Sequence, residues 1–265
     1  MKIKEIVSAL ERFAPLPLQD GFDNAGLQIG LTDAEATGAL LCLDVTEAVL
    51  DEAIALGYNL VISHHPLIFK GYKSITGKDY VERCILKAIK NDIVIYSAHT
   101  NLDNAYGGVN YKIAEKIGLK NLQVLEPKEN SLQDDLMQAG AGIVGELDEP
   151  ETELEFLKRI KKTFEVGCVR HNRLTGREIQ KVALCGGAGA FLLPQAIRAG
   201  ADVFITGEIK YHDYFGHEGD ILMAEIGHYE SEQYTKEIFY SIIRDLFPNF
   251  ALQLSKINTN PIKYL

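Results

Sequence analysis

Histidine is scarce in this chain of 265 residues, and four of its seven histidines lie in three short polar segments. The segments are residues 63–66 (SHHP), 99–103 (HTNLD) and 228–232 (HYESE), and each follows an apolar run. Imidazole and carboxylate groups gathered in this way can bind metal ions or transfer protons. These three polar segments are therefore the first candidates for a functional site.

The adjacent residues His64 and His65 allow two interpretations. Neighbouring side chains on a regular strand point to opposite faces, so the pair suits one metal ion poorly unless the backbone turns. Such a turn is possible just beyond a strand end, before Pro66, and two imidazoles could then bind two neighbouring ions. The alternative is a pair of ordinary histidines in a loop or in the core.

The other two polar segments repeat one spacing, because a carboxylate follows each histidine at the fourth position. His228 and Glu232 would share one face of a helix, although surface pairs with this spacing are common. Taken together, His64, His65 and His228 supply neutral nitrogens, and Asp103 and Glu232 supply carboxylates that can bridge two ions. This mixed donor set suits Zn, Mn, Fe, Co or Ni, and it leaves coordination positions open for water, as in catalytic sites.

Two further side chains are candidates for proton transfer. His99 could be a metal ligand, a proton relay, a partner that orients Asp103, or simply a histidine that caps a loop. Glu208 occupies the position equivalent to His65 in the internal repeat described below, and His212 follows it. Glu208 could act as a base or contact a substrate, or it could be an acid favoured at a helix N-terminus.

The elements that must position these side chains alternate between apolar strands and amphipathic helices. Strands are predicted at 39–45, 59–63, 93–98, 181–185, 202–206 and 221–226, and helices at 1–13, 47–56, 80–90, 108–117, 151–163, 191–199 and 231–246. This alternation predicts βαβ units with a largely parallel sheet, so the fold class is α/β. Ligands bind such sheets beyond the carboxyl ends of the strands, where the polar segments lie.

The two halves of the chain resemble each other weakly. Three landmarks recur with a common offset of 143 residues: Cys42, Gly57 and Ser63 align with Cys185, Gly200 and Thr206. Any two βαβ units share some features, but the common offset favours an internal duplication. We therefore predict two similar α/β/α halves with the metal site in the cleft between them. Their predicted bounds are 1–128 and 142–265, joined by a linker at 129–141.

Composition restricts the class of protein further. The chain has 37 acidic and 27 basic residues, and its formal net charge of −10 opposes a role in binding nucleic acids. No apolar run approaches the roughly 18 residues of a membrane span, and residues 1–13 are amphipathic, unlike a signal peptide. The four cysteines form no C-x-x-C pair and lie in or beside apolar runs, which indicates buried, reduced thiols in a cytoplasmic protein.

Two glycine-containing turns remain. Residues 185–190 (CGGAGA) follow a strand and open a helix, so their N–H groups could bind phosphate, or the turn could simply join the two elements. Residues 23–28 (DNAGLQ) form a polar turn to which residue chemistry alone assigns no purpose.

Several of these segments resemble the signature motifs of one known family. Residues 22–30 (FDNAGLQIG) resemble its W-D-N-x-G-L-Q-x-G motif, and residues 63–67 (SHHPL) resemble its S-H-H-P motif. The set is completed by AHTNLD ending at Asp103, TGE ending at Glu208, and Gly227-His228 with Glu232. From residue 2 to about residue 247 the chain is thus similar to the Ngg-interacting-factor-like family of dinuclear metal proteins, short form, often labelled homologues of GTP cyclohydrolase 1 type 2.

The resemblance implies two divalent transition-metal ions per chain, a ring-shaped homohexamer, and two α/β halves with the metal site between them. The implied metal ligands are His64, His65, Asp103, His228 and Glu232. Longer relatives insert an extra α+β domain where this chain has only the short segment 130–140, so that domain is expected to be absent. Phe22 replaces the usual Trp of the family, which we expect to alter packing and to leave the metals unaffected.

Two functions are compatible with these features. The first is a metal-dependent hydrolase, similar to GTP cyclohydrolase, that acts on a nucleotide-like or phosphorylated small molecule. His99 or Glu208 would then be the catalytic residues that move protons. The second is a non-catalytic metal-binding regulatory or scaffold protein, with tightly bound metal and no turnover. In both cases we expect a cytoplasmic homo-oligomer without membrane or nucleic-acid partners.

Overall fold

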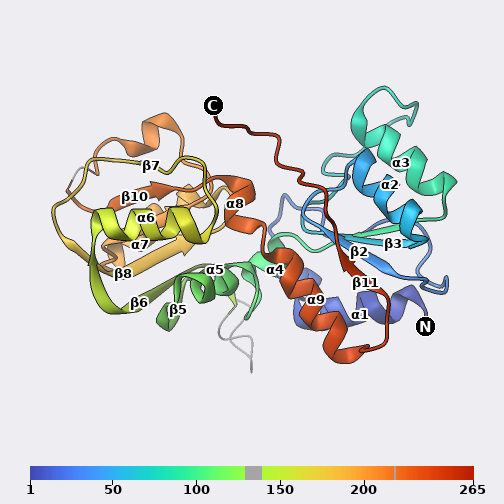
Figure 1. The fold of residues 1–265 in the computed structure, drawn as a ribbon, viewed down its shortest axis with the longest axis horizontal. Helices are drawn as coiled ribbons and strands as arrows, with labels where there is room; N and C mark the ends of the chain where they lie inside the picture. Colours follow the sequence, from blue (N-terminus) through green and yellow to red (C-terminus); the bar gives the residue numbers. More distant parts are fainter. Residues whose placement is uncertain (129–138, 218) are drawn as a thin grey trace. The chain divides into compact units, whose positions relative to one another are not determined.

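The structure is a computed structural model that describes residues 1–128, 139–217 and 219–265. Its chain forms two compact units, each built on one β-sheet (Figure 1). Unit 1 contains Met1–Leu102 and Thr235–Pro261, and unit 2 contains Asp103–Tyr234 and Ile262–Leu265. None of the helices in the described part of the chain has the length and apolar character needed to cross a bilayer.

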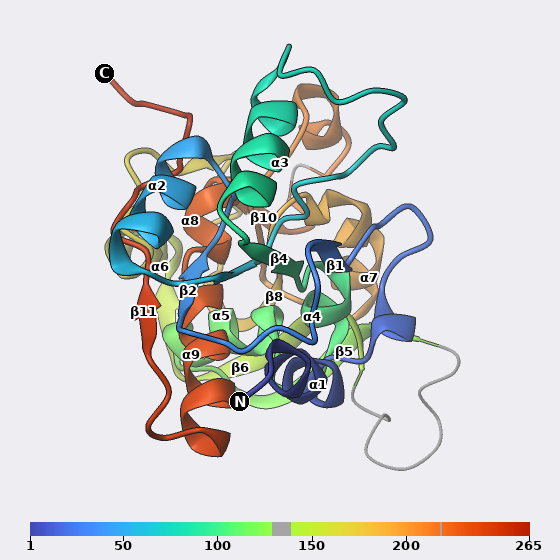
Figure 2. The same cartoon turned by 90° about the vertical axis from the view of Figure 1, so that its right-hand side faces the viewer.

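Unit 1 has a five-stranded sheet with the order β1-β4-β3-β2-β11. Its strands are β1 (Gly26–Ile29), β2 (Ala39–Cys42), β3 (Leu60–Ser63), β4 (Val94–Ser97) and β11 (Leu252–Leu254). Its helices are α1 (Ile3–Phe13), the short 3-10 helix η1 (Leu16–Leu18), α2 (Glu47–Leu56), α3 (Tyr80–Lys90) and α9 (Thr235–Leu246). Strand β1 is antiparallel to β4, and the other neighbours are parallel. Helices α2 and α3 cover one face of this sheet, and α1 and α9 cover the other (Figures 1 and 2).

Unit 2 has a six-stranded sheet with the order β5-β6-β8-β9-β10-β7. Its strands are β5 (Lys120–Pro127), β6 (Gly140–Thr152), β7 (Arg170–His171), β8 (Glu178–Cys185), β9 (Val203–Thr206) and β10 (Leu222–Glu225). Its helices are α5 (Val109–Ile117), α6 (Glu153–Thr163), η4 (Gly189–Leu192), α7 (Leu193–Arg198), η5 (Tyr211–Tyr214) and α8 (His228–Glu232). Strands β8, β9 and β10 are parallel, whereas β5, β6 and β7 are antiparallel to their neighbours. A further short helix, α4 (Thr100–Asn104), lies where the chain passes from unit 1 to unit 2.

Local sequence accounts for the helices that follow the first parallel strands. Helix α2 begins after Thr46, whose hydroxyl accepts a hydrogen bond from the N–H of Val49, and helix α3 begins after Asp79, which caps it in the same way. Gly57 ends α2 in the left-handed conformation, with a φ of 68°. Strands β2, β3 and β4 are buried along their whole length, as expected for parallel strands covered on both faces.

The register of the parallel strands is consistent with the predicted duplication. Strand β2 pairs with β3 so that Cys42 lies opposite Ser63, and β8 pairs with β9 so that Cys185 lies opposite Thr206. Every aligned pair of β2 and β3 maps onto a pair of β8 and β9 with the offset of 143 residues found in the sequence. Gly200 has a φ of 69°, which nearly equals that of its counterpart Gly57. The chain therefore has the α/β fold with two similar halves that its sequence predicted.

The bounds of the two units differ from the predicted segments 1–128, 129–141 and 142–265. Residues 129–138 of the predicted linker lie outside the described residues, as does most of the segment 130–140 where we expect no inserted domain. The linker joins β5 and β6, which are antiparallel neighbours in the sheet of unit 2. Unit 1 instead includes α9 and β11 from the end of the chain, because α9 packs on α1 and β11 pairs with β2.

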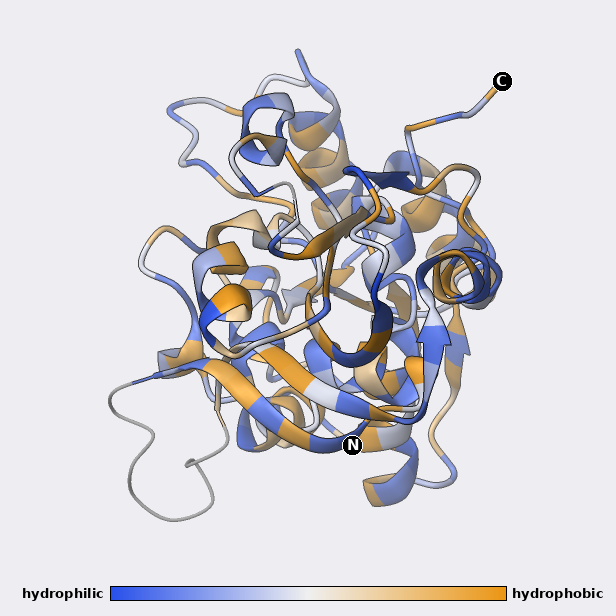
Figure 3. Cartoon of the chain, turned by 90° about the vertical axis from the view of Figure 1, so that its left-hand side faces the viewer, coloured by the Kyte–Doolittle hydropathy of each residue, from blue (hydrophilic) through white to orange (hydrophobic). Residues whose placement is uncertain are grey.

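Strands β5 and β6 were not predicted, because their sequences do not form continuous apolar runs. Apolar and polar residues alternate along them, as Figure 3 shows for the two strands that adjoin the grey trace. The predicted helix 231–246 is divided into α8 and α9. The four cysteines are free, and three are buried as predicted, but Cys168 is exposed because it lies in the loop before the edge strand β7.

Candidate metal centre

Three histidines of unit 1 lie together beyond the carboxyl ends of two neighbouring strands. His64 and His65 follow β3, and His99 follows β4. The ring centroids are 4.9 Å apart for His64 and His65, 5.2 Å for His64 and His99, and 5.4 Å for His65 and His99. Each ring offers one nitrogen that lies within 4.8 Å of those of the other two. Because parallel strands end at the same edge of a sheet, the fold brings together residues from separate segments of the chain.

The backbone turns after β3, so that two adjacent histidines can approach one point. The N–H groups of His64 and His65 both donate to the carbonyl of Leu43, over 3.1 and 3.0 Å. The hydroxyls of Ser63 and Ser97 are 2.8 Å apart, and both donate to the carbonyl of His65. These contacts fix the backbone turn without which the two adjacent imidazoles could not approach one site.

Each of the three histidines in unit 1 uses Nδ1 for a contact with an oxygen acceptor. Nδ1 of His64 lies 2.9 Å from the carbonyl oxygen of Ala98, Nδ1 of His65 lies 2.7 Å from Asp44, and Nδ1 of His99 lies 2.8 Å from Asp23. Carbonyl and carboxylate oxygens only accept, so Nδ1 carries the proton and the lone pair is on Nε2. A hydrogen bond of this kind orients a histidine and raises its basicity toward a metal ion.

Asp23 gives the polar turn 23–28 its purpose. Its carboxylate accepts hydrogen bonds from His99 and from the N–H and hydroxyl of Thr100. Burial acts to raise the pKa of Asp23, but the hydrogen bonds from His99 and Thr100 outweigh it and lower the pKa to about 2. Asn24 and Gln28 of the same turn bond the backbone of Ile68. The turn therefore orients His99 and fixes the loop that follows the histidine pair.

Replacing Asp23 with asparagine is expected to make the free energy of unfolding depend less on pH between about pH 4 and pH 2. The pKa of Asp23 is about 2 in the folded protein against 3.8 for a free carboxyl, so its contribution is complete above pH 3.8 and is lost as the pH falls toward 2. Urea unfolding of metal-free protein between about pH 4 and pH 2 measures this dependence. The control Asp213→Asn removes an exposed carboxylate and should keep the slope of the wild type. Equal slopes for Asp23→Asn and the wild type would contradict the assignment.

Unit 2 holds a second group of donors, on α8 and at the end of α4. Nε2 of His228 lies 3.1 Å from Oε2 of Glu232, and carboxylate oxygens of Asp103 and Glu232 lie within 4.8 Å of each other. Two ligands about 2.0–2.2 Å from one ion have donor atoms roughly 3 Å apart, so the contact of His228 with Glu232 has the separation of a coordinating pair. Glu232 is only 3% exposed, which makes a cation an effective partner for its charge.

Glu208 contacts the Nδ1 of His228 over 2.7 Å. This repeats the arrangement of His65 with Asp44 and of His99 with Asp23, and it leaves the Nε2 of His228 toward Glu232. The contact favours an orienting role for Glu208 over the predicted role as a base. His212 packs edge-on against Tyr211, and no group of potential metal ligands in the described residues includes it.

The glycine-rich turn 185–190 packs against the second donor group, and three of its N–H groups are bonded within the protein. The N–H of Gly186 donates to Asn110, that of Gly187 to Ser231, and that of Gly189 to Thr206. Three N–H groups of the turn are thus already bonded within the protein, which favours the interpretation of the turn as a connection between strand and helix. The amide of Asn110 also donates to the carbonyl of Asp103, which connects the turn to that ligand's backbone.

The structure places every candidate side chain in one of the two donor groups or in contact with one. His99 lies with the predicted ligands His64 and His65, and Glu208 contacts the predicted ligand His228. The other predicted ligands, Asp103 and Glu232, belong to the second donor group. The orienting carboxylates Asp23 and Asp44 were not predicted as part of the site, although Asp23 belongs to the motif at residues 22–30. The metal assignment itself stays a prediction.

Comparison with known proteins gives a consistent family assignment. The profile of the family described as Duf34/NIF3 (NGG1p interacting factor 3) matches residues 1–261. A Clostridium perfringens protein named "GTP cyclohydrolase 1 type 2 homolog" is 38% identical over 235 residues, which cover 88% of this chain and 87% of the relative. A Lactococcus lactis protein of the same name is 34% identical over 271 aligned positions, covering 98% of both chains.

Solved structures share the fold. The crystal structure of a hypothetical protein of Staphylococcus aureus superposes with a TM-score of 0.91 at 32% sequence identity, covering 100% of this chain and 99% of that chain. The similarity therefore extends over both units.

Proposed function

Since this chain belongs to the Duf34/NIF3 family, we propose that it is a dinuclear metal-binding hydrolase of a nucleotide-like small molecule. The proposed ligands of two divalent transition-metal ions are His64, His65, Asp103, His228 and Glu232. The observation that carries the proposal is that the three predicted histidine ligands, His64, His65 and His228, each have Nδ1 in hydrogen-bond contact with an oxygen acceptor. A histidine in this state has its lone pair on Nε2, ready to bind a metal ion.

The chemistry of the donors fits the proposed ions. Neutral imidazoles combined with carboxylates suit Zn, Fe, Mn, Co or Ni better than Ca or Mg, which prefer oxygen ligands alone. His64 is fully buried and Glu232 is nearly so, which excludes water from one side of each donor group. Five ligands leave positions open for substrate, as in catalytic metal sites.

The ions would supply Lewis-acid polarisation of the bond under attack, and the protein side chains would supply proton transfer. His99 is the proposed catalytic residue, because Asp23 holds a proton on its Nδ1 and leaves Nε2 as a base within the histidine group. Glu208 is a proposed positioning residue that orients His228 through Nδ1. The substrate class rests on the name of the relatives, GTP cyclohydrolase 1 type 2 homolog.

The test combines metal analysis with substrate profiling. Protein purified without oxygen is expected to contain two transition-metal ions per chain and to deplete a nucleotide-like compound from a metabolite mixture. Asp103→Ala should lose metal and turnover together, and its metal-free thermal stability should stay close to that of the metal-free wild type. Bound metal without any turnover, with Asp103→Ala indistinguishable from the wild type, would refute the hydrolase and favour a metal-binding regulator.

A further inference from the structure

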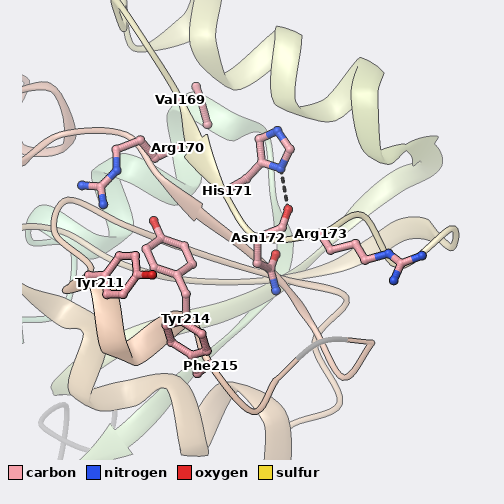
Figure 4. A pocket seen from close by; sticks show the side chains of 8 residues that line it. All are labelled: Val169, Arg170, His171, Asn172, Arg173, Tyr211, Tyr214 and Phe215. Atoms are coloured by element: carbon pink, nitrogen blue, oxygen red, sulfur yellow. Dashed lines mark hydrogen bonds between the residues drawn. The ribbon is translucent and has the colours of Figure 1, made fainter.

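A pocket of about 590 Å³ opens at the edge of the sheet of unit 2, and it contains none of the metal donors or their orienting carboxylates. One wall is formed by β7 and the residues beside it, and the other by η5 and Phe215 (Figure 4). Strand β7 is an edge strand that pairs only with β10 among the described strands. The volume lies within the range of about 300–1,000 Å³ that is usual for small-molecule sites.

The pocket is lined by cations in a protein whose net charge is −10. Arg170 and Arg173 both line it, and none of its described lining residues is acidic. Arg170 forms an ion pair with Glu225 over 2.7 Å. The exposed Arg173 has no hydrogen bond or ion pair to any other described residue. One guanidinium is therefore anchored by the fold, and the other is available for a ligand.

The opposite wall presents aromatic rings to solvent. Tyr211 is 69% exposed and Phe215 is 56% exposed, and their rings meet edge to face with centroids 5.3 Å apart. Tyr214 between them is half-buried, and its hydroxyl donates to Glu225, the same carboxylate that holds Arg170. Figure 4 shows the three rings gathered on one side of Asn172 and the side chain of Arg173 extending on the other.

From this juxtaposition we propose that the pocket binds a nucleoside monophosphate. The exposed rings of Tyr211 and Phe215 offer a face for a planar base, since every base has a π-face for stacking. The guanidinium of Arg173 has the geometry to bind phosphate oxygens through two N–H donors. Glu225 ties Arg170 and Tyr214 together, which presets the shape of the pocket before a ligand enters. The inference does not depend on the metal centre or on the proposed hydrolase.

Calorimetric titration of the metal-loaded full chain with adenosine 5′-monophosphate tests the proposal. The nucleotide should bind at least about 10-fold more tightly than adenosine or inorganic phosphate alone, because only the nucleotide engages both walls. Arg173→Ala and Tyr211→Ala should each weaken binding by roughly 10-fold or more, whereas Tyr211→Phe, which keeps the ring, should retain it. The matched control Arg12→Ala changes the net charge equally on an exposed face of α1 and should have no effect.

Three results would overturn the proposal. The nucleotide could bind no better than its parts, or Arg173→Ala and Tyr211→Ala could leave its affinity unchanged. The same two variants could instead change the oligomeric state in light scattering and leave nucleotide binding unaltered, which would make the pocket a contact between copies of the chain. Asp103→Ala separates this inference from the proposed hydrolase, because it should abolish metal binding and leave the pocket's affinity intact.

Discussion

Replacing Glu232 with glutamine is expected to weaken the binding of divalent metal ions by more than about 100-fold while the fold stays intact. Losing an outer partner of a ligand already costs roughly 10- to 100-fold in affinity, and the loss of an anionic ligand should cost more. Glutamine has the size of glutamate, so it fits the same space beside His228 and Gly187. Its neutral amide oxygen is a poor ligand for transition-metal ions, and it cannot balance their charge.

The matched control for this variant is Glu230→Gln, on the same short helix. Glu230 is 7% exposed and Glu232 is 3% exposed, so both substitutions remove one buried carboxylate from α8. Only Glu232 belongs to a group of potential metal ligands in the described residues. Metal titration monitored by calorimetry, with elemental analysis of the purified proteins, should show a loss for Glu232→Gln alone. Equal metal content and affinity in the two variants would remove Glu232 from the ligand set.

The elements around the predicted site were predictable because their sequences carry strong local signals. The bounds of α2 and α3 are those predicted from the sequence. In the structure, Thr46 and Asp79 cap the starts of these helices, and Gly57 ends α2. The parallel strands β2, β3, β4 and β9 are fully buried, and their sequences are therefore continuous apolar runs. Strands β5 and β6 carry no such run, and they acquire their structure by pairing with each other and with β8. Such pairing is a tertiary effect that single-sequence patterns do not reveal.

The candidate ligands could be predicted from residue type and position, but the residues that orient them could not. Asp44 is separated from His65 by 21 residues and Asp23 from His99 by 76, so no local spacing connects either pair. Glu208 was predicted from the internal repeat, which places it at the position of His65, and from the TGE motif of the family resemblance. In the structure it orients His228, whereas its counterpart His65 is itself a proposed ligand. The duplicated scaffold thus carries different chemistry at equivalent strand ends, which explains why the repeat predicts positions better than roles.

Replacing Gly187 with alanine is expected to reduce metal affinity, whereas the same change at Gly200 should leave it unaltered. Both glycines have left-handed backbones, with φ values of 60° and 69°, so alanine should destabilise the protein by a similar amount at both, about 1–2 kcal/mol. The surroundings of the two positions differ. A Cβ at Gly200 would meet nothing within 4 Å, but a Cβ at Gly187 would lie 2.4 Å from Oε1 of Glu232.

The steric conflict at Gly187 must be relieved by movement of the Glu232 carboxylate, because the backbone of the turn is held. The carbonyl of Gly187 accepts hydrogen bonds from the hydroxyl of Thr206 and the N–H of Glu208, and its own N–H donates to Ser231. The end of a glutamate side chain rotates at little cost in stability, yet it would carry the ligand oxygen away from Nε2 of His228. Urea unfolding of the metal-free proteins should therefore place Gly187→Ala close to Gly200→Ala, and metal titration should separate them. Equal metal affinities in the two variants would show that this turn does not set the position of Glu232.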